Sequence, residues 1–165
     1  MENRSRAAAA RFEVVDPRSS DAISSMSAYF AELNEIFPTG FDPGDTLTAD
    51  ASEFDPPAGT FVVIRGGETG DTEIAGCGGV HTLEPGISEI KRMWVDPAWR
   101  GVGLAPRLLA DLENRAAAIG HSTVRLDTNA TLTTAIAMYE RAGYRPIERY
   151  NDNPFAQRWF EKHIA

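Results

Sequence analysis

The sequence predicts an α/β domain in which helices cover a mixed β-sheet. The stretch between Phe61 and Val95 holds apolar, strand-like runs separated by glycine and proline turns, which is the pattern of an antiparallel meander. From Leu104 the apolar spacing changes to that of a helix, and the chain then alternates between strands and helices. Antiparallel strands that lead into such a crossover are typical of a mixed sheet. No solenoid-type repeat is present in the sequence.

The chain has 165 residues, a length that suits one domain with a substantial core. Hydrophobic residues make up 42% and charged residues 24%, as in ordinary globular proteins, and this composition excludes a disordered chain. No apolar run approaches the roughly 20 residues of a membrane-spanning helix, and the N-terminal segment lacks the apolar stretch of a signal peptide. We therefore expect a flexible tail over residues 1–10, a single domain over residues 11–165, a cytoplasmic location and no membrane partner.

The formal net charge is −8, which argues against a nucleic-acid-binding protein because such domains carry a basic face. Eight acidic residues and no lysine or arginine lie between residues 19 and 64, so this segment accounts for the whole net charge. The single cysteine, Cys77, excludes an internal disulfide, and the three histidines have no zinc-ligand spacing. We expect no metal site, and we interpret Cys77 as a buried thiol.

The N-terminal part of the domain is predicted to contain a strand, a helix and a long connection. Residues 12–15 suggest the strand, which ends at Asp16-Pro17, and the serines that follow can cap a helix running to about Glu35. The apolar residues of that helix recur at helical spacing: Ile23, Met26, Phe30 and Leu33. Prolines and glycines then interrupt an acidic connection up to about residue 59. Because this connection is long for a loop without a function, we interpret it as a candidate lid.

Three strands are expected over residues 61–65, 74–83 and 87–95, joined by turns at residues 66–71 and 84–86. The last of these strands is closed by Asp96-Pro97. Glycine and proline end the runs at each turn, as is usual for antiparallel neighbours.

The C-terminal part is predicted to alternate helices with strands. A helix runs from Leu104 to Gly120, with Leu108, Leu112 and Ala116 on one face. The remaining elements follow in order: a strand over 122–128, a helix over 129–142, a strand over 144–148 and a last strand around 157–162.

The stretch from Val95 to Leu109 combines a strand end, a glycine turn and a helix start. The first N–H groups of a helix lack internal partners and bear partial positive charge, and Gly101 and Gly103 would let the backbone approach an anion. Arg100 and Arg107 add full positive charges. A plain connection that needs glycine only for its flexibility remains open at this point. The lysine of a nucleotide P-loop and the third glycine of a dinucleotide-binding turn are both absent.

Three elements of the sequence resemble the GCN5-related N-acetyltransferases. Residues 100–105, R-G-V-G-L-A, match the R/Q-x-x-G-x-G/A signature of that family. Residues 89–97 are similar to the strand that leads into the signature, and residues 135–144 are similar to its A-x-x-x-Y-x-x-x-G-F/Y element. The resemblance covers roughly Gly59 to Lys162. It becomes vague over residues 1–58, the variable part of the family that covers the acceptor, so residues 19–64 are expected to form an acidic acceptor-covering segment.

The resemblance implies the acyl-CoA N-acyltransferase fold, in which the fourth and fifth strands splay apart to admit the pantetheine arm of acetyl-CoA. The backbone amides of the signature would hold the pyrophosphate, and Asn129 would either bond the pantetheine or cap a helix. Pro106 makes the anion site weaker than it could be, because proline has no backbone N–H and the first turn of the helix therefore offers one donor fewer. The cofactor-binding residues implied in this way are Met93, Trp94, Val95, Arg100, Gly101, Val102, Gly103, Leu104, Ala105 and Asn129.

The resemblance also implies two catalytic residues. An amine must lose a proton before it attacks a thioester, and the departing thiolate must gain one. Tyr139 matches the tyrosine that protonates the sulfur, although an aromatic residue on a helix face is also a common core residue. Glu89 falls where many relatives carry a base, acting directly or through water, and a solvated strand carboxylate is the alternative. His81 is the reserve candidate for the base.

These features predict direct acetyl transfer from acetyl-CoA to a primary amine in a ternary complex, by a monomer or a homodimer. The acidic segment suggests a small, cationic acceptor, with a solubilising surface as the alternative. Two other functions stay open: a non-catalytic acyl-CoA sensor and a protein-lysine acetyltransferase.

Overall fold

A computed structural model of the chain describes residues 2–37, 40, 51–67 and 73–164. It contains a seven-stranded sheet in the order β1-β2-β3-β4-β5-β7-β6. In chain order the elements are α1 (Glu2–Ala8), β1 (Arg11–Val14), α2 (Ser20–Ile36), the 3-10 helix η1 (Ala51–Phe54), β2 (Gly59–Arg65), β3 (Ile74–Glu84), β4 (Ile87–Val95), the 3-10 helix η2 (Pro97–Trp99), α4 (Leu104–Ile119), β5 (Thr123–Thr128), α5 (Thr133–Arg141), β6 (Arg145–Ile147) and β7 (Arg158–His163).

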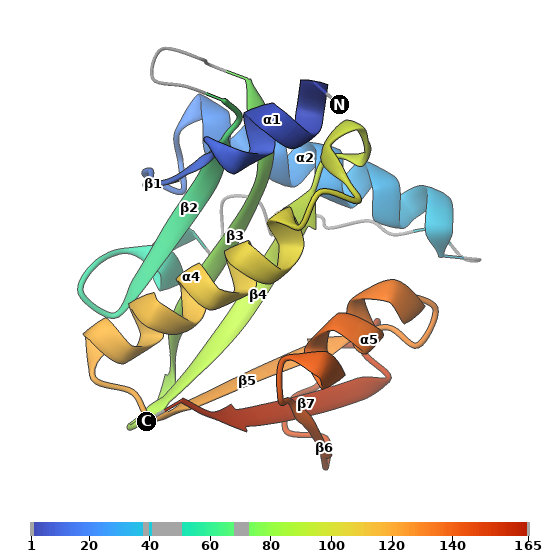
Figure 1. The fold of residues 1–165 in the computed structure, drawn as a ribbon. Helices are drawn as coiled ribbons and strands as arrows, with labels where there is room; N and C mark the ends of the chain where they lie inside the picture. The colour runs from blue at the N-terminus through green and yellow to red at the C-terminus, as the bar shows by residue number, and fades with distance from the viewer. Residues whose placement is uncertain (1, 38–39, 41–50, 68–72, 165) are drawn as a thin grey trace.

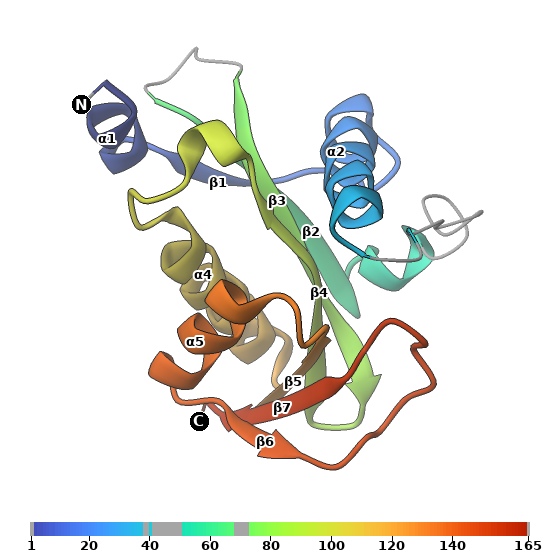
Figure 2. The ribbon, with the colours of Figure 1, turned by 90° about the vertical axis from the view of Figure 1, so that its right-hand side faces the viewer.

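Helices cover both faces of the sheet, with α2 on one side and α4 and α5 on the other (Figure 2). An apolar cluster on the α4 side includes Trp99, Leu108 and Leu112, and a second cluster on the α2 side includes Met26 and Phe54. Neighbouring strands from β1 to β4 are antiparallel, whereas β4 and β5 are parallel. The predicted mixed sheet flanked by helices is therefore confirmed.

The parallel pairing of β4 with β5 ends early. It joins Ile87–Glu89 to Thr123–Arg125, after which the two strands diverge (Figure 1). A β-bulge in β4 accompanies the divergence, because Lys91 and Trp94 lie opposite Gly79 and Cys77 of β3. Arg92 in this bulge has a φ of 60°, a left-handed conformation that a residue other than glycine rarely adopts. Bulges bend a strand and increase its twist, so this one helps to turn β4 away from β5.

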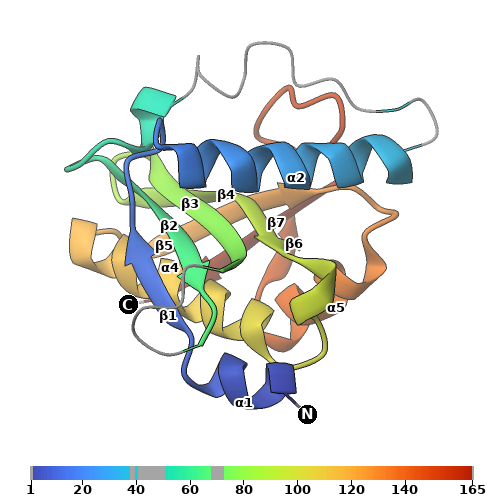
Figure 3. The ribbon, with the colours of Figure 1, turned by 90° about the horizontal axis from the view of Figure 1, so that it is seen from above.

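Helix α2 begins where its sequence predicts. Ser19 is the N-cap residue and accepts a hydrogen bond from the amide of Ala22. The helix lies on the same side of the sheet as the segment that joins β6 to β7 (Figure 3). Part of the candidate lid, residues 38–39 and 41–50, lies outside the described residues, as does part of the turn expected at 66–71.

The N-terminal segment differs from the expected flexible tail, because Glu2–Ala8 forms helix α1. Ala7 is only 1% exposed, and the Arg6 guanidinium lies 4.6 Å from the centre of the Trp99 ring. Alanine favours helix, and one small buried side chain leaves no apolar periodicity to detect in the sequence. Helix α5 also begins later than expected, at Thr133. None of the helices described for this chain combines the length and the apolar character that crossing a membrane requires.

Candidate active site

Beyond Glu89, the edge of β4 that faces β5 has no strand partner among the described residues. We call residues 90–95 along this side the free edge of β4. Three of the expected cofactor-binding residues belong to this segment: Met93 and Val95, which pack with the α4-side cluster, and Trp94, which packs with the α2-side cluster. Backbone groups without a ladder partner can bind an extended chain, as an exposed sheet edge does.

The glycine turn joins the end of the free edge to α4. Gly101 and Gly103 have φ values of 79° and 84°, and a Cβ added at either position would meet nothing within 4 Å. Backbone conformation, rather than crowding, therefore explains both glycines. Within the described part of the chain, the amides of residues 101–105 donate no hydrogen bond to another residue. Together with the α4 dipole, these amides form a site suited to an anion.

The two arginines expected to supply charge at the turn are engaged elsewhere. Arg100 Nε donates to the Val95 carbonyl at 2.9 Å, and its Nη2 lies 2.7 Å from both carboxylate oxygens of Glu32. Arg107 Nη1 donates to the Ala7 carbonyl at 2.6 Å. Arg100 thus links the turn to α2, and Arg107 links α4 to α1.

Tyr139 lies on α5 and is 8% exposed, with its ring beside those of Tyr144 and Phe160. Burial and the nearby Asp127 raise the pKa of Tyr139 to about 12. The hydroxyl is therefore protonated at neutral pH, and it makes no hydrogen bond to any described residue. The ring packs in the core, as one of the two interpretations expected, and the role of the hydroxyl as the acid stays a prediction.

Glu89 is 4% exposed, so the alternative of a solvated strand carboxylate is wrong. Its Oε1 lies 2.9 Å from His81 Nε2, and its Oε2 accepts a hydrogen bond of 2.6 Å from the Tyr150 hydroxyl. Burial alone would raise the pKa of Glu89, but the hydrogen bonds from His81 and Tyr150 and the charge of Lys91 lower it below its usual value. His81 is itself buried between this carboxylate and the Thr82 carbonyl.

Asp127 is a site residue that sequence reasoning missed. It lies on β5 and accepts hydrogen bonds from Asn151 Nδ2 at 2.5 Å and from Asn153 Nδ2 at 3.2 Å. Burial and the charge of Glu89 raise the pKa of Asp127, against the lowering effect of the two amides and of Lys91. An aspartate inside a strand is uncommon, and this was the signal available in the sequence.

Tyr29 was also missed, although its position on the apolar side of α2 is visible in the helical spacing. Burial raises the pKa of its hydroxyl strongly, and the neighbouring Tyr139 and Asp127 raise it further. Tyr29 of α2 is therefore within electrostatic range of Tyr139 on α5 and of Asp127 on β5.

Asn129 has a structural role that the sequence only partly indicates. Its Nδ2 donates to the Phe155 carbonyl at 2.7 Å, and its Oδ1 accepts from the amide and the hydroxyl of Thr131. The N-cap of α5 is Leu132, so Asn129 caps the turn before the helix and not the helix itself. Both ends of its side chain are thus in use.

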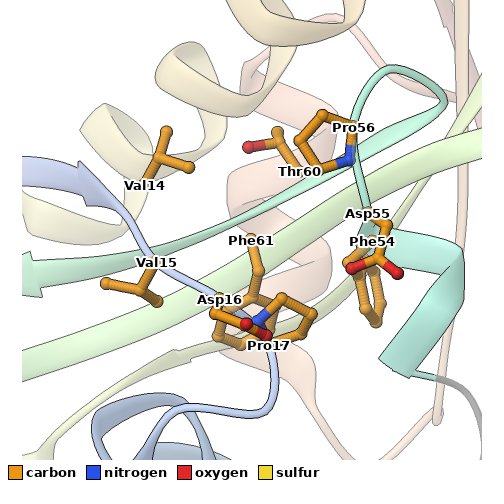
Figure 4. A pocket seen from close by; sticks show the side chains of 9 residues that line it. All are labelled: Val14, Val15, Asp16, Pro17, Phe54, Asp55, Pro56, Thr60 and Phe61. Carbon is orange, nitrogen blue, oxygen red and sulfur yellow. The ribbon is translucent and has the colours of Figure 1, made fainter.

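A pocket of about 250 Å³ lies elsewhere, between β2, η1 and the end of β1 with the connection that follows it (Figure 4). It is lined by Val14, Val15, Asp16, Pro17, Phe54, Asp55, Pro56, Thr60 and Phe61. None of the expected site residues lines it. Within residues 2–37, 40, 51–67 and 73–164, no group of three or more His, Cys, Asp and Glu side chains is placed to hold a metal ion.

Comparisons with known sequences agree with this geometry. A sequence model of the acetyltransferase (GNAT) family matches residues 26–144. The chain is 34% identical over 111 residues to an uncharacterised N-acetyltransferase of Schizosaccharomyces pombe, which covers 67% of this chain and 66% of that protein. It is 35% identical over 100 residues to the IAA acetyltransferase of Azospirillum brasilense, covering 58% and 63% of the two chains. The chain thus spans just under two thirds of the length of these curated relatives.

Solved structures show the same architecture. A protein of Klebsiella pneumoniae assigned as an acyl-CoA N-acyltransferase has a TM-score of 0.74 at 28% identity, covering 94% of this chain and 98% of that one. A GNAT-family acetyltransferase of Staphylococcus aureus has a TM-score of 0.77 at 15% identity, covering 94% and 100%. The splayed sheet and the glycine turn therefore define the acyl-CoA N-acyltransferase fold. The sequence match shows further that this chain belongs to the acetyltransferase (GNAT) family.

The glycine turn yields a first prediction. Gly103→Ala should lower the free energy of unfolding by about 1 kcal/mol, because alanine is strained at positive φ, and Gly103→Asn should lower it less. Gly66 is the contrast, since a Cβ there would lie 2.4 Å from the Trp99 ring. Gly66→Asn should therefore be no better tolerated than Gly66→Ala. Urea unfolding of the four variants measures this, and equal losses for Gly103→Ala and Gly103→Asn would contradict it.

The Glu89 network yields a second prediction. A carboxylate whose pKa is lowered on folding stabilises the protein above its unfolded pKa, about 4.3, and this contribution is lost as the pH falls through the lower folded value. Glu89→Gln should therefore lower the free energy of unfolding by about 2 kcal/mol at pH 7, and by less near pH 3. Urea unfolding at both pH values tests this. The exposed Glu140→Gln on α5 is the control, and a loss from Glu89→Gln that is independent of pH would refute the prediction.

Proposed function

We propose that this protein transfers an acetyl group from acetyl-CoA directly to a primary amine of a small acceptor. The observation that carries the proposal is the continuity of the free edge of β4 with the unpaired amides of the glycine turn. The extended pantetheine arm would bind the free edge of β4, and the diphosphate that follows it would bind the amides of the turn. Membership of the acetyltransferase (GNAT) family supports the reaction type.

The residues present fit the donor. Amides of Gly101, Val102, Gly103, Leu104 and Ala105 would hold the pyrophosphate, and Arg100 would act by fixing the turn through its bond to Val95. The edge at Met93 to Val95 would bond the pantetheine arm, and Asn129 would hold the turn after β5 in place. The donor supplies an acetyl group activated as a thioester. Pro106 lies in the first turn of α4, where proline is tolerated, so the loss of one N–H leaves the anion site usable.

The catalytic groups follow from burial and charge. Tyr139 would donate its proton to the departing sulfur, since its raised pKa keeps it protonated at neutral pH. Glu89, with His81 and Tyr150, belongs to a buried network that would handle the proton leaving the amine. Water and bulk ions have little access to these groups, which strengthens their electrostatic effect.

The charge of residues 19–64 is largely balanced within the described structure. Asp21, Glu32, Glu53 and Asp55 form ion pairs with arginines and a lysine from outside the segment. Asp42, Asp45 and Asp50 lie outside the described residues. Because these carboxylates are already paired, they support an acceptor with a single primary amine more than an acceptor with several positive charges. We further propose that the protein works in the cytoplasm as a monomer or homodimer and has no membrane partner. Its net charge of −8 supports the absence of a nucleic-acid partner.

Tyr139→Phe should reduce kcat for thiol release by about 10²-fold while the affinity for acetyl-CoA is retained, because it removes only a proton donor. Steady-state thiol release against a panel of amines and calorimetry with acetyl-CoA measure the two quantities. Tyr144→Phe is the matched control, since the Tyr144 hydroxyl bonds Glu113. A parent protein that binds acetyl-CoA but turns over no amine would favour the sensor, and labelling confined to protein lysines would favour the protein acetyltransferase.

A further inference from the structure

The two diverging strands each carry one carboxylate, buried at Glu89 and half-buried at Asp127, and a single amide joins them. Asn151 Nδ2 lies 2.5 Å from Asp127 Oδ2 on β5 and 3.5 Å from Glu89 Oε2 on β4. Glu89 and Arg125 form the last residue pair of the parallel ladder, so Asp127 lies two residues beyond the point where the strands part. The loop before β7 therefore bridges the carboxylates at the start of the free edge of β4.

We propose that Asp127, and not Glu89, accepts the proton from the acceptor amine, while Glu89 and Asn151 are positioning residues that hold Asp127. This inference rests on the proposed acetyl transfer. It assigns the base of that reaction to β5.

The hydrogen-bond partners of the two carboxylates differ in kind. Both oxygens of Glu89 are engaged, one with His81 and the other with the Tyr150 hydroxyl at 2.6 Å. Both oxygens of Asp127 are engaged as well, but with two neutral amides, those of Asn151 and Asn153. Glu89 has a third partner, Asn151 Nδ2 at 3.5 Å, so Asp127 keeps the larger acceptor capacity for a substrate N–H, because each carboxylate oxygen has two lone pairs. Glu89 is the better fixed of the two, as a positioning residue should be.

The charges around Asp127 also favour this residue as the base. Glu89 and Lys91 face it from β4, Tyr139 from α5, Tyr29 from α2 and Tyr150 from the loop before β7. Burial and the Glu89 charge raise the pKa of Asp127 despite Lys91, whereas the pKa of Glu89 is lowered. A general base works best when its pKa is close to the working pH, and the pKa of Asp127 is shifted in that direction whereas that of Glu89 is shifted away from it.

Position also favours Asp127. Its charge raises the pKa of Tyr139 and of Tyr29, so it lies within electrostatic range of the hydroxyl proposed to protonate the sulfur. The base and the acid of the reaction would then act on one substrate from β5 and α5. Arg125, two residues earlier on β5, is paired with Glu161 at 2.9 Å, so it does not form an ion pair with Asp127.

The proton balance is complete with these groups. An N–H bond of the ammonium breaks and its proton goes to an Asp127 oxygen, and the freed nitrogen lone pair forms the bond to the thioester carbon. The C–S bond breaks with its electron pair on sulfur, which takes the Tyr139 proton. The second proton lost by the nitrogen restores Tyr139, and Asp127 releases its own to solvent.

Asp127→Asn tests the assignment. We expect kcat at pH 7 to fall about 10²-fold with the acetyl-CoA affinity unchanged. The deficit should shrink as the pH approaches the pKa of the acceptor's ammonium group, because the free amine needs no base. Glu89→Gln should lower kcat less, and it should shift the acidic limb of the kcat/KM profile to lower pH, because it removes the charge that raises the pKa of Asp127. Asp152→Asn is the matched control in the same loop, since its side chain is 103% exposed.

The opposite results would overturn the assignment: Asp127→Asn with a wild-type rate and profile, or Glu89→Gln alone removing the acidic limb. A carboxyl-carbon NMR titration of the wild-type chain gives a second readout that does not depend on the variants folding. Asp127 should take up its proton at a higher pH than Glu89, and the reverse order contradicts the inference. If no amine in the panel makes the wild-type protein release thiol, the proposed function fails and the inference fails with it. If it is active and Asp127→Asn is equally active, only the inference fails.

Discussion

The early end of the pairing between β4 and β5 is the constraint on which the rest of the site depends. Had the ladder continued past Glu89, the backbone groups of residues 90–95 would be satisfied by β5 and no extended ligand could bond them. The bulge at Arg92 turns the strand, and the buried guanidinium lies 3.2 Å from Met26 Sδ of α2, so the helix lies against the bent strand. Strain at one residue is thus held by packing on α2.

The polar groups at the base of the diverging strands are a consequence of this arrangement. Where the strands part, Glu89 of β4 and Asp127 of β5 lie near each other, and the segment before β7 supplies hydrogen-bond donors to both. A buried network of this kind is stable only when its members are bonded, because an unpaired buried charge is costly. Hydrogen bonds lower the pKa of Glu89, whereas burial raises the pKa of Asp127, so the two carboxylates differ in acidity.

The sequence predicts what depends on neighbouring residues and misses what depends on distant ones. The strand end, the glycine turn and the helix from Leu104 are local, so their positions were predicted well. Asp127 meets Asn151, and Arg100 meets Glu32, only through the fold, and no spacing in the chain reveals these contacts. Helix α1 was missed because its packing depends on Trp99 and not on an apolar pattern of its own.

The central claim is that unpaired amides after Trp99 bind a diphosphate at the end of the free edge of β4. The most direct test compares the calorimetric affinities of acetyl-CoA and of acetyl-pantetheine, which shares the arm but lacks the diphosphate and the adenosine 3′-phosphate beyond it. The account predicts binding of acetyl-CoA and a loss of roughly 100-fold or more without the diphosphate, about 2.7 kcal/mol. Equal affinities for the two compounds, or no binding of acetyl-CoA, would contradict it.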